Sequence, residues 1–160
     1  MSALSTLENL TLLHLHRCDD IGALTVLPPR PASLRGLSLY GFPNLPSLDG
    51  IGRWDGLKTI ELFECPLLID LAPLASITSL EHVSLGIFSA APIDLSPLTS
   101  LPRLKTISLK GHGAFDLSSL SGIRDAVITV PPSARITGED KLQPTSRVTR
   151  SAYAESVAGS

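Results

Sequence analysis

The sequence predicts an α/β solenoid, in which short parallel strands stack into one sheet and brief helical turns return the chain between them. Three observations predict this fold. An apolar pattern, Leu-x-x-Leu-x-Leu, recurs with starting positions 24, 23, 23, 24 and 19 residues apart. The segments between the patterns also resemble one another. Leucine makes up 29 of the 160 residues whereas aromatic residues are few, as suits a core of repeated aliphatic layers.

Five good copies of the pattern and one degenerate copy define the expected strands. In each copy the last two apolar residues are two positions apart, so their side chains lie on one face of a strand. One strand cannot bury that face alone, whereas stacked copies share one core. The apolar triplets are Leu10, Leu13, Leu15; Leu34, Leu37, Leu39; Leu57, Ile60, Leu62; Leu80, Val83, Leu85; Leu104, Ile107, Leu109; and the degenerate Ile123, Ala126, Ile128.

The segments between the strands predict short 3-10 or α turns on the convex side of the solenoid. Residues 70–74, 94–98 and 116–120 align without gaps, and each segment begins with Asp. Aspartate is a good N-cap, and the Pro or Ser that follows is compatible with a first helical turn. Trp54 falls in the corresponding segment of an earlier repeat and is expected in the core.

The period and pattern resemble the leucine-rich repeat family over roughly residues 4–130. The phrase Asp-Leu-Ser-Pro-Leu is similar to the internalin and SDS22-like subclass and to the repeats of bacterial NACHT-type NTPases. The resemblance implies an arc with a parallel sheet on its concave face. It does not identify a function, because this fold serves many binding roles.

The family usually places Asn or Cys three residues after the last strand leucine, where the side chain serves the exposed backbone of the turn. Here the equivalent residues are Cys18, Phe42, Cys65 and Phe88, followed by His112. This departure predicts a turn spine lined by phenylalanine. Cys18 and Cys65 are two repeats apart, about 10 Å at the usual strand spacing. That separation excludes a disulfide and makes a shared metal site equally poor.

The repeats predict the domain organisation. Residues 1–130 are expected to form the solenoid, which starts in the middle of a repeat and lacks a polar cap before its first strand. Solenoid ends need caps, so we expect further domains before this chain, the alternative being a partner that covers the end. Residues 131–150 are expected to form a cap of short extended pieces around Ile136 and Val148, or else a disordered tail. Residues 151–160 are expected to be disordered.

Composition and motifs disfavour several classes of function. The net charge of −2 provides no electrostatic footprint for nucleic acid. No apolar run is long enough to cross a membrane, and no signal peptide is visible, so a cytoplasmic location is expected. No nucleophile–base pair, phosphate loop or Cys-rich metal motif is present. We therefore expect no enzyme activity, no cofactor and no metal.

The outward-facing strand residues are the candidate site. Neighbouring strands lie about 4.8 Å apart, so His16, Tyr40 and Phe63 should form one exposed aromatic stripe. Exposed aromatic side chains anchor protein interfaces, although cross-strand packing with no partner is the alternative. In the degenerate repeat, Val127 is expected beside Ser108. The expected partner-binding residues are His14, His16, Tyr40, Glu61, Phe63, His82 and Lys110.

The pair His14 and His16 near Glu61 has the residue types of a metal site, but the open face and a distance of about 10 Å between His14 and Glu61 favour solvated binding residues. We expect a non-catalytic module that recognises a protein partner, one version being the C-terminal sensor part of a larger NACHT-like NTPase. The alternatives are a secreted internalin-like adhesion repeat and an SDS22-like regulatory subunit of an enzyme. Replacing Tyr40 and Phe63 together by Ala is expected to leave folding nearly intact.

Overall fold

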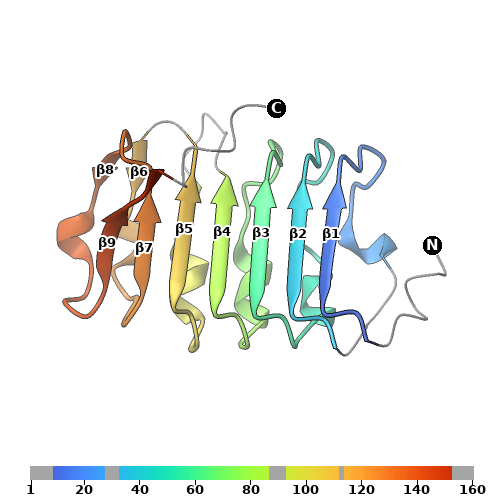
Figure 1. Cartoon of the computed structure of the whole chain (residues 1–160), viewed down its shortest axis with the longest axis horizontal. Helices are drawn as coiled ribbons and strands as arrows, with labels where there is room; N and C mark the ends of the chain where they lie inside the picture. The colour runs from blue at the N-terminus through green and yellow to red at the C-terminus, as the bar shows by residue number, and fades with distance from the viewer. Residues whose placement is uncertain (1–8, 28–32, 87–92, 112–113, 153–160) are drawn as a thin grey trace.

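The computed structural model describes residues 9–27, 33–86, 93–111 and 114–152, and in it the chain winds as a solenoid (Figure 1). Seven parallel strands form one sheet in the order β1-β2-β3-β4-β5-β7-β9, so consecutive repeats are neighbours in space. This confirms the predicted α/β solenoid. The strands of the sheet are β1 (Leu12–His16), β2 (Gly36–Tyr40), β3 (Thr59–Phe63), β4 (His82–Gly86), β5 (Thr106–Lys110), β7 (Val127–Val130) and β9 (Arg147–Arg150).

The return segments form short 3-10 helices that lie behind the sheet in Figure 1. Successive 3-10 helices pack against one another along the convex side, from η3 to η7. A second, two-stranded sheet pairs β6 (Ala114–Asp116) with β8 (Arg135–Thr137). The 3-10 helices are η2 (Leu24–Val26), η3 (Ile51–Arg53), η4 (Ala72–Ser76), η5 (Ser96–Ser100), η6 (Ser118–Leu120) and η7 (Glu139–Lys141).

Aspartate begins three of these turns. The carboxylates of Asp70, Asp94 and Asp116 accept hydrogen bonds from the backbone N–H two residues later, at 2.8, 2.8 and 2.9 Å. Each Asp stands one residue before the N-cap position, which a leucine occupies. The predicted capping role is therefore present one position earlier than expected, because the leucine must point into the core.

The core lies between the sheet and the 3-10 helices and consists of the repeated leucines. Leu37, Leu39, Ile60 and Ile107 are 0–1% exposed. Trp54 belongs to this core, as predicted, with 4% of its surface exposed. In β1, at one end of the solenoid, Leu13 and Leu15 are only half-buried.

A left-handed backbone residue follows four of the described strands, β1, β2, β3 and β5. The second residue after the last leucine has a φ of 51° at Arg17, 70° at Gly41, 52° at Glu64 and 112° at Gly111. This conformation turns the chain sharply away from the sheet, and glycine adopts it without steric cost. The next residue, Phe42 in its repeat, is completely buried.

The turn spine differs between its members. Cys18 and Cys65 are free and half-buried, and their Sγ atoms contact the carbonyl oxygens of His16 and Phe63 at 3.7 and 3.3 Å. Burial raises the pKa of the Cys65 thiol to about 11, so the thiol stays protonated at neutral pH. Phe88 and His112 lie outside the described residues.

The degenerate sixth repeat is shifted from the expected alignment by two residues. Val127 pairs with Thr106 and Thr129 pairs with Ser108, so the expected placement of Val127 beside Ser108 is wrong. Asp125 precedes this strand with a φ of 54°, a sharp turn that the leucine pattern does not reveal. Val148 lies in the final strand β9, which continues the main sheet beyond β7, and Ile136 lies in β8 of the two-stranded sheet.

Candidate partner-binding face

The outward-facing residues of the seven-stranded sheet form one face, here called the concave face, against which no described element packs (Figure 1). The half-repeats return the chain behind the sheet, so alternate strand side chains point into open space. Leu12 is 50% exposed on this face, and His14, His16 and His82 are also exposed. The face therefore offers side chains from several strands to a second molecule.

Cross-strand pairing aligns four of the expected site residues in one row. His16 pairs with Tyr40, which pairs with Phe63. The rings of His16 and Tyr40 are stacked, with centroids 4.6 Å apart, and those of Tyr40 and Phe63 are tilted at 6.3 Å. The Lys110 ammonium group lies 4.8 Å from the centroid of the Phe63 ring. These distances suit aromatic stacking and a cation–π contact.

Gly86 allows Lys110 to reach Phe63. In the strand register, Gly86 stands between Phe63 and Lys110. Because glycine has no side chain, the Lys110 chain crosses this position and covers the ring. Phe63, which lies between Tyr40 and Lys110, is only 6% exposed, which differs from the expectation of an exposed aromatic ring. The burial of Phe63 supports a structural role for this end of the row.

Tyr40 holds its place in the row through a residue that sequence reasoning missed. Its hydroxyl donates a 2.6 Å hydrogen bond to Oε1 of Glu64, in the turn after β3. This hydrogen bond, together with desolvation, raises the pKa of Tyr40 above its ordinary value. The signal in the sequence is the carboxylate one position beyond the Phe63 strand end. The predicted register does not reveal the contact, because the left-handed backbone at Glu64, with a φ of 52°, directs the carboxylate towards Tyr40.

A separate hollow lies on the same face, over β2 and between β1 and β3. Gly36 and Ser38 of β2 form its floor, while Leu12 and His14 stand on one side and Thr59 and Glu61 on the other. Thr11, Arg35 and Leu37 complete the lining, and the hollow has a volume of about 360 Å³. The sequence places His14 and Glu61 on one open face, two strands and about 10 Å apart. The structure brings them to opposite walls of one concavity.

His82 lies apart from both features. Its Nδ1 is 2.5 Å from Oγ1 of Thr106, its register partner on β5. Among the described residues, no three His, Cys, Asp or Glu side chains gather as potential metal ligands. Within the same described ranges, no helix is long and apolar enough to cross a membrane.

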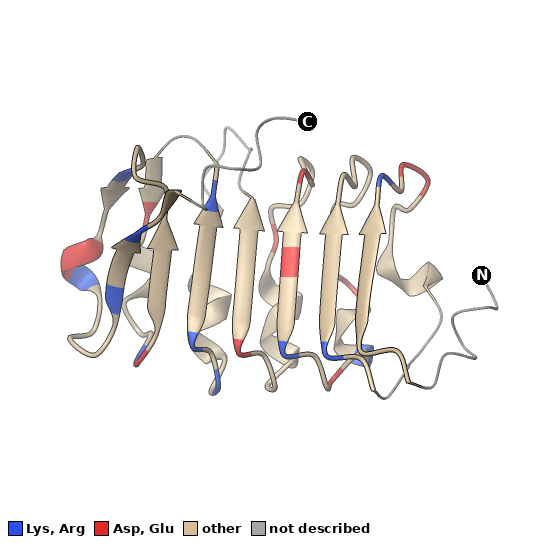
Figure 2. Ribbon diagram, in the orientation of Figure 1, with Lys and Arg blue, Asp and Glu red and all other residues tan. Residues whose placement is uncertain are grey.

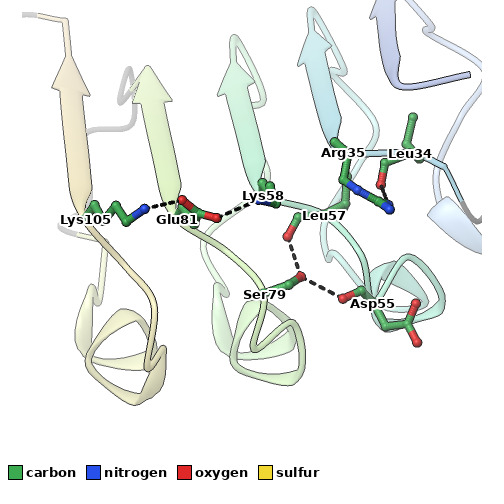
Figure 3. A network of polar contacts seen from close by, with 8 residues as sticks. All are labelled: Leu34, Arg35, Asp55, Leu57, Lys58, Ser79, Glu81 and Lys105. Atoms are coloured by element: carbon green, nitrogen blue, oxygen red, sulfur yellow. Dashed lines mark hydrogen bonds and ion pairs between the residues drawn. The ribbon is translucent and has the colours of Figure 1, made fainter.

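A row of charged residues edges the concave face where the strands begin. Glu81 lies between Lys58 at 3.0 Å and Lys105 at 2.5 Å (Figure 3). Hydrogen bonds from Lys105 and Lys58 lower the pKa of Glu81 to about 2. At the next strand, Nη1 of Arg35 donates to the carbonyl of Leu34 at 3.1 Å. These contacts hold the charges at the rim of the sheet.

A cavity of about 420 Å³ opens at the other end of the strands, near the turns after β2 and β3. Its inner wall is apolar, with Leu62, Leu68 and Leu85, and Arg17 and Glu64 are among the residues at its edge. Two of its lining residues, Gly86 and Ile93, flank residues 87–92, which the structure does not describe.

Comparison with known structures agrees with the fold. The chain is similar to internalin C2 from Listeria monocytogenes strain 4b F2365, with 24% sequence identity and a TM-score of 0.52. The similarity covers 89% of this chain and 73% of that chain. No protein-family model matches the sequence, and no curated protein matches it either. Internalin C2 is a leucine-rich repeat protein, and the likeness identifies the leucine-rich repeat fold.

Proposed function

We propose that this chain is a non-catalytic recognition module that binds a protein partner on its concave face. The observation that carries the proposal is the open sheet face with exposed His14, His16 and Leu12 beside a formed hollow. A rigid sheet holds these side chains in place before binding, which lowers the entropic cost of association. The interface residues we propose are His14, His16, Tyr40, Glu61, His82 and Lys110, with Phe63 as a buried support.

The row of His16 and Tyr40 supplies aromatic surface of the kind that is enriched at protein interfaces. Its position is defined by the ring stacking at 4.6 Å and by the Tyr40–Glu64 hydrogen bond. Residues with fixed rotamers lose little conformational freedom when a partner docks. Binding a protein surface at this part of the face therefore costs less conformational entropy than binding through a flexible charged loop would.

The test compares two carboxylate substitutions at exposed positions. His16→Glu introduces a charge on the concave face, and Val26→Glu introduces one at a 54% exposed position in η2. Proteins that bind the immobilised chain are identified by mass spectrometry, and the affinity of each is then measured with purified material. We expect His16→Glu to weaken binding at least about tenfold and Val26→Glu to leave it unchanged. Equal binding of the partner by the wild type, His16→Glu and Val26→Glu would contradict a role for the concave face.

The proposal has three versions, which differ in what the rest of the protein carries. In the first version, the repeats are the sensor part of a larger NACHT-like NTPase in the cytoplasm. That version predicts a native protein far larger than 16.9 kDa with a phosphate-binding loop. A secreted adhesion repeat predicts a signal peptide and a surface anchor instead. A regulatory subunit predicts one enzyme that co-purifies and is lost with His16→Glu. The native mass and the identity of the partner distinguish the three.

A further inference from the structure

We infer that the hollow over Gly36 and Ser38 is a subsite for one basic side chain, Arg or Lys, of the protein partner. The inference rests on the proposed function, because it assumes a partner on the concave face. It adds the chemistry of one contact.

Glu61 is the only carboxylate within the seven strands of the sheet, and Figure 2 shows it as the single acidic band along the middle of β3. Its register partners are Ser38 and Ser84, which are neutral. Glu61 is half-buried, and in the described part of the chain no ion pair or hydrogen bond to its carboxylate is found. A half-buried carboxylate without a partner gains a strong, charge-assisted hydrogen bond when a cation reaches it.

The shape of the hollow fits a long side chain with an apolar stem. Gly36 leaves room for the Leu12 side chain, because a Cβ at position 36 would lie 2.4 Å from Cδ1 of Leu12. Leu12 leans over this space and offers a half-exposed apolar wall opposite Thr59. Arg and Lys pack their methylene stems on such surfaces while their charged ends remain with polar groups. The volume of about 360 Å³ admits a side chain but not a folded element.

The remaining charges around the hollow are compatible with a cation at Glu61. Arg35 is the only permanently cationic residue that lines it, and its guanidinium is turned to the carbonyl of Leu34 at the start of the strand (Figure 3). Lys110 is held over Phe63. On the wall opposite Glu61, the His14 imidazole provides a ring nitrogen that can accept a hydrogen bond. An acidic side chain of a partner would instead meet the Glu61 carboxylate and be repelled.

The test uses nuclear magnetic resonance on the full chain labelled with nitrogen-15. N-acetyl-arginine methylamide is titrated against its neutral isostere, N-acetyl-citrulline methylamide. We expect the arginine compound to cause saturable shifts in the amides of Gly36, Ser38 and Glu61. Glu61→Gln should weaken this binding at least about tenfold, because it removes the charge while it keeps the size. Glu139→Gln, at an exposed position in η7, is the matched control and should bind as the wild type does.

Equal shifts with the two compounds, shifts outside the hollow, or binding that survives Glu61→Gln would overturn the subsite. Unchanged amide spectra away from residue 61 would show that the variant is folded. The result can be separated from the test of function. Loss of partner binding in His16→Glu without any arginine preference in the hollow would leave the recognition module and refute the subsite. Arginine binding in the hollow, with no effect of His16→Glu on the binding of any partner, would support the hollow as a site for a basic side chain and would contradict the proposed interface around His16.

Discussion

The hydroxyl of Tyr40 lies 2.6 Å from Oε1 of Glu64, and this contact joins a strand residue of one repeat to a turn residue of the next. Glu64 occupies the left-handed position after β3, with a φ of 52°. The turn therefore points the carboxylate back across the sheet edge to the neighbouring strand. Through this bond the turn fixes the orientation of a side chain on the concave face.

This contact predicts an unusual titration of Tyr40. The hydrogen bond to Glu64 raises its pKa above the ordinary value of 10.0, so the folded state keeps the proton longer than the unfolded chain. The associated stability is present below the ordinary pKa and is lost as the pH rises through the raised value. We expect Glu64→Ala to return the pKa of Tyr40 towards 10.0. Ultraviolet absorbance of tyrosinate measures this, and Tyr40→Phe identifies the signal against Tyr153. An unchanged titration in Glu64→Ala would contradict the assignment.

Phe63 should behave as a core residue. It is 6% exposed beneath Lys110, so Phe63→Ala removes a buried ring and opens a cavity. We expect a loss of about 3–5 kcal/mol in the free energy of unfolding, measured by urea denaturation. Leu12→Ala, at a 50% exposed position on the same face, should cost less than about 1 kcal/mol. This replaces the expectation that Phe63 can be removed with folding nearly intact. Equal costs for the two variants would contradict the burial of Phe63.

Glu81 should make the stability of the protein depend on acid pH. Its pKa is lowered to about 2 from 4.5 by Lys105 and Lys58, so its contribution is present above pH 4.5 and is lost as the pH falls towards 2. We expect Glu81→Gln to flatten the fall in the urea midpoint over this interval. Because the two lysine side chains are 53% and 64% exposed, added salt should reduce the difference between the two proteins. A parallel pH profile for Glu81→Gln would show that other carboxylates dominate.

Gly138, which follows β8, should be required for the close packing of this segment against Ser118 at the start of η6. It has a φ of 74°, and a Cβ there would lie 2.4 Å from the backbone nitrogen of Ser118. We expect Gly138→Ala to lower the free energy of unfolding by about 1–3 kcal/mol or more. Gly122→Ala is the matched control, since its Cβ would lie 3.6 Å or more from Thr99 and should cost less than about 1 kcal/mol. Thermal unfolding of both variants decides the point, and similar midpoints would argue against a tight approach at Gly138.

The sequence by itself determined the solenoid, the parallel pairing and the buried faces of the strands. The reason is physical: a Leu-x-x-Leu-x-Leu unit with a period of about 23 residues buries its apolar face only when copies stack in register. Trp54 and the capping aspartates were accessible to the same reasoning, because their roles depend on local sequence and on the repeat. The predicted pairing of the sixth repeat with β5 was wrong by two residues. The turn at Asp125 causes this shift, and the leucine pattern contains no sign of it.

The tertiary structure alone decided how the concave residues interact. The sequence placed His16, Tyr40 and Phe63 in one row, but the burial of Phe63 depends on the missing side chain of Gly86, across which Lys110 reaches. From the sequence, His14 and Glu61 were expected to be solvated residues on an open face, whereas in the structure they line one hollow over Gly36 and Ser38. Such features depend on the size and the polarity of the side chain at the paired position of a neighbouring strand. That information arises only when the strands are assembled.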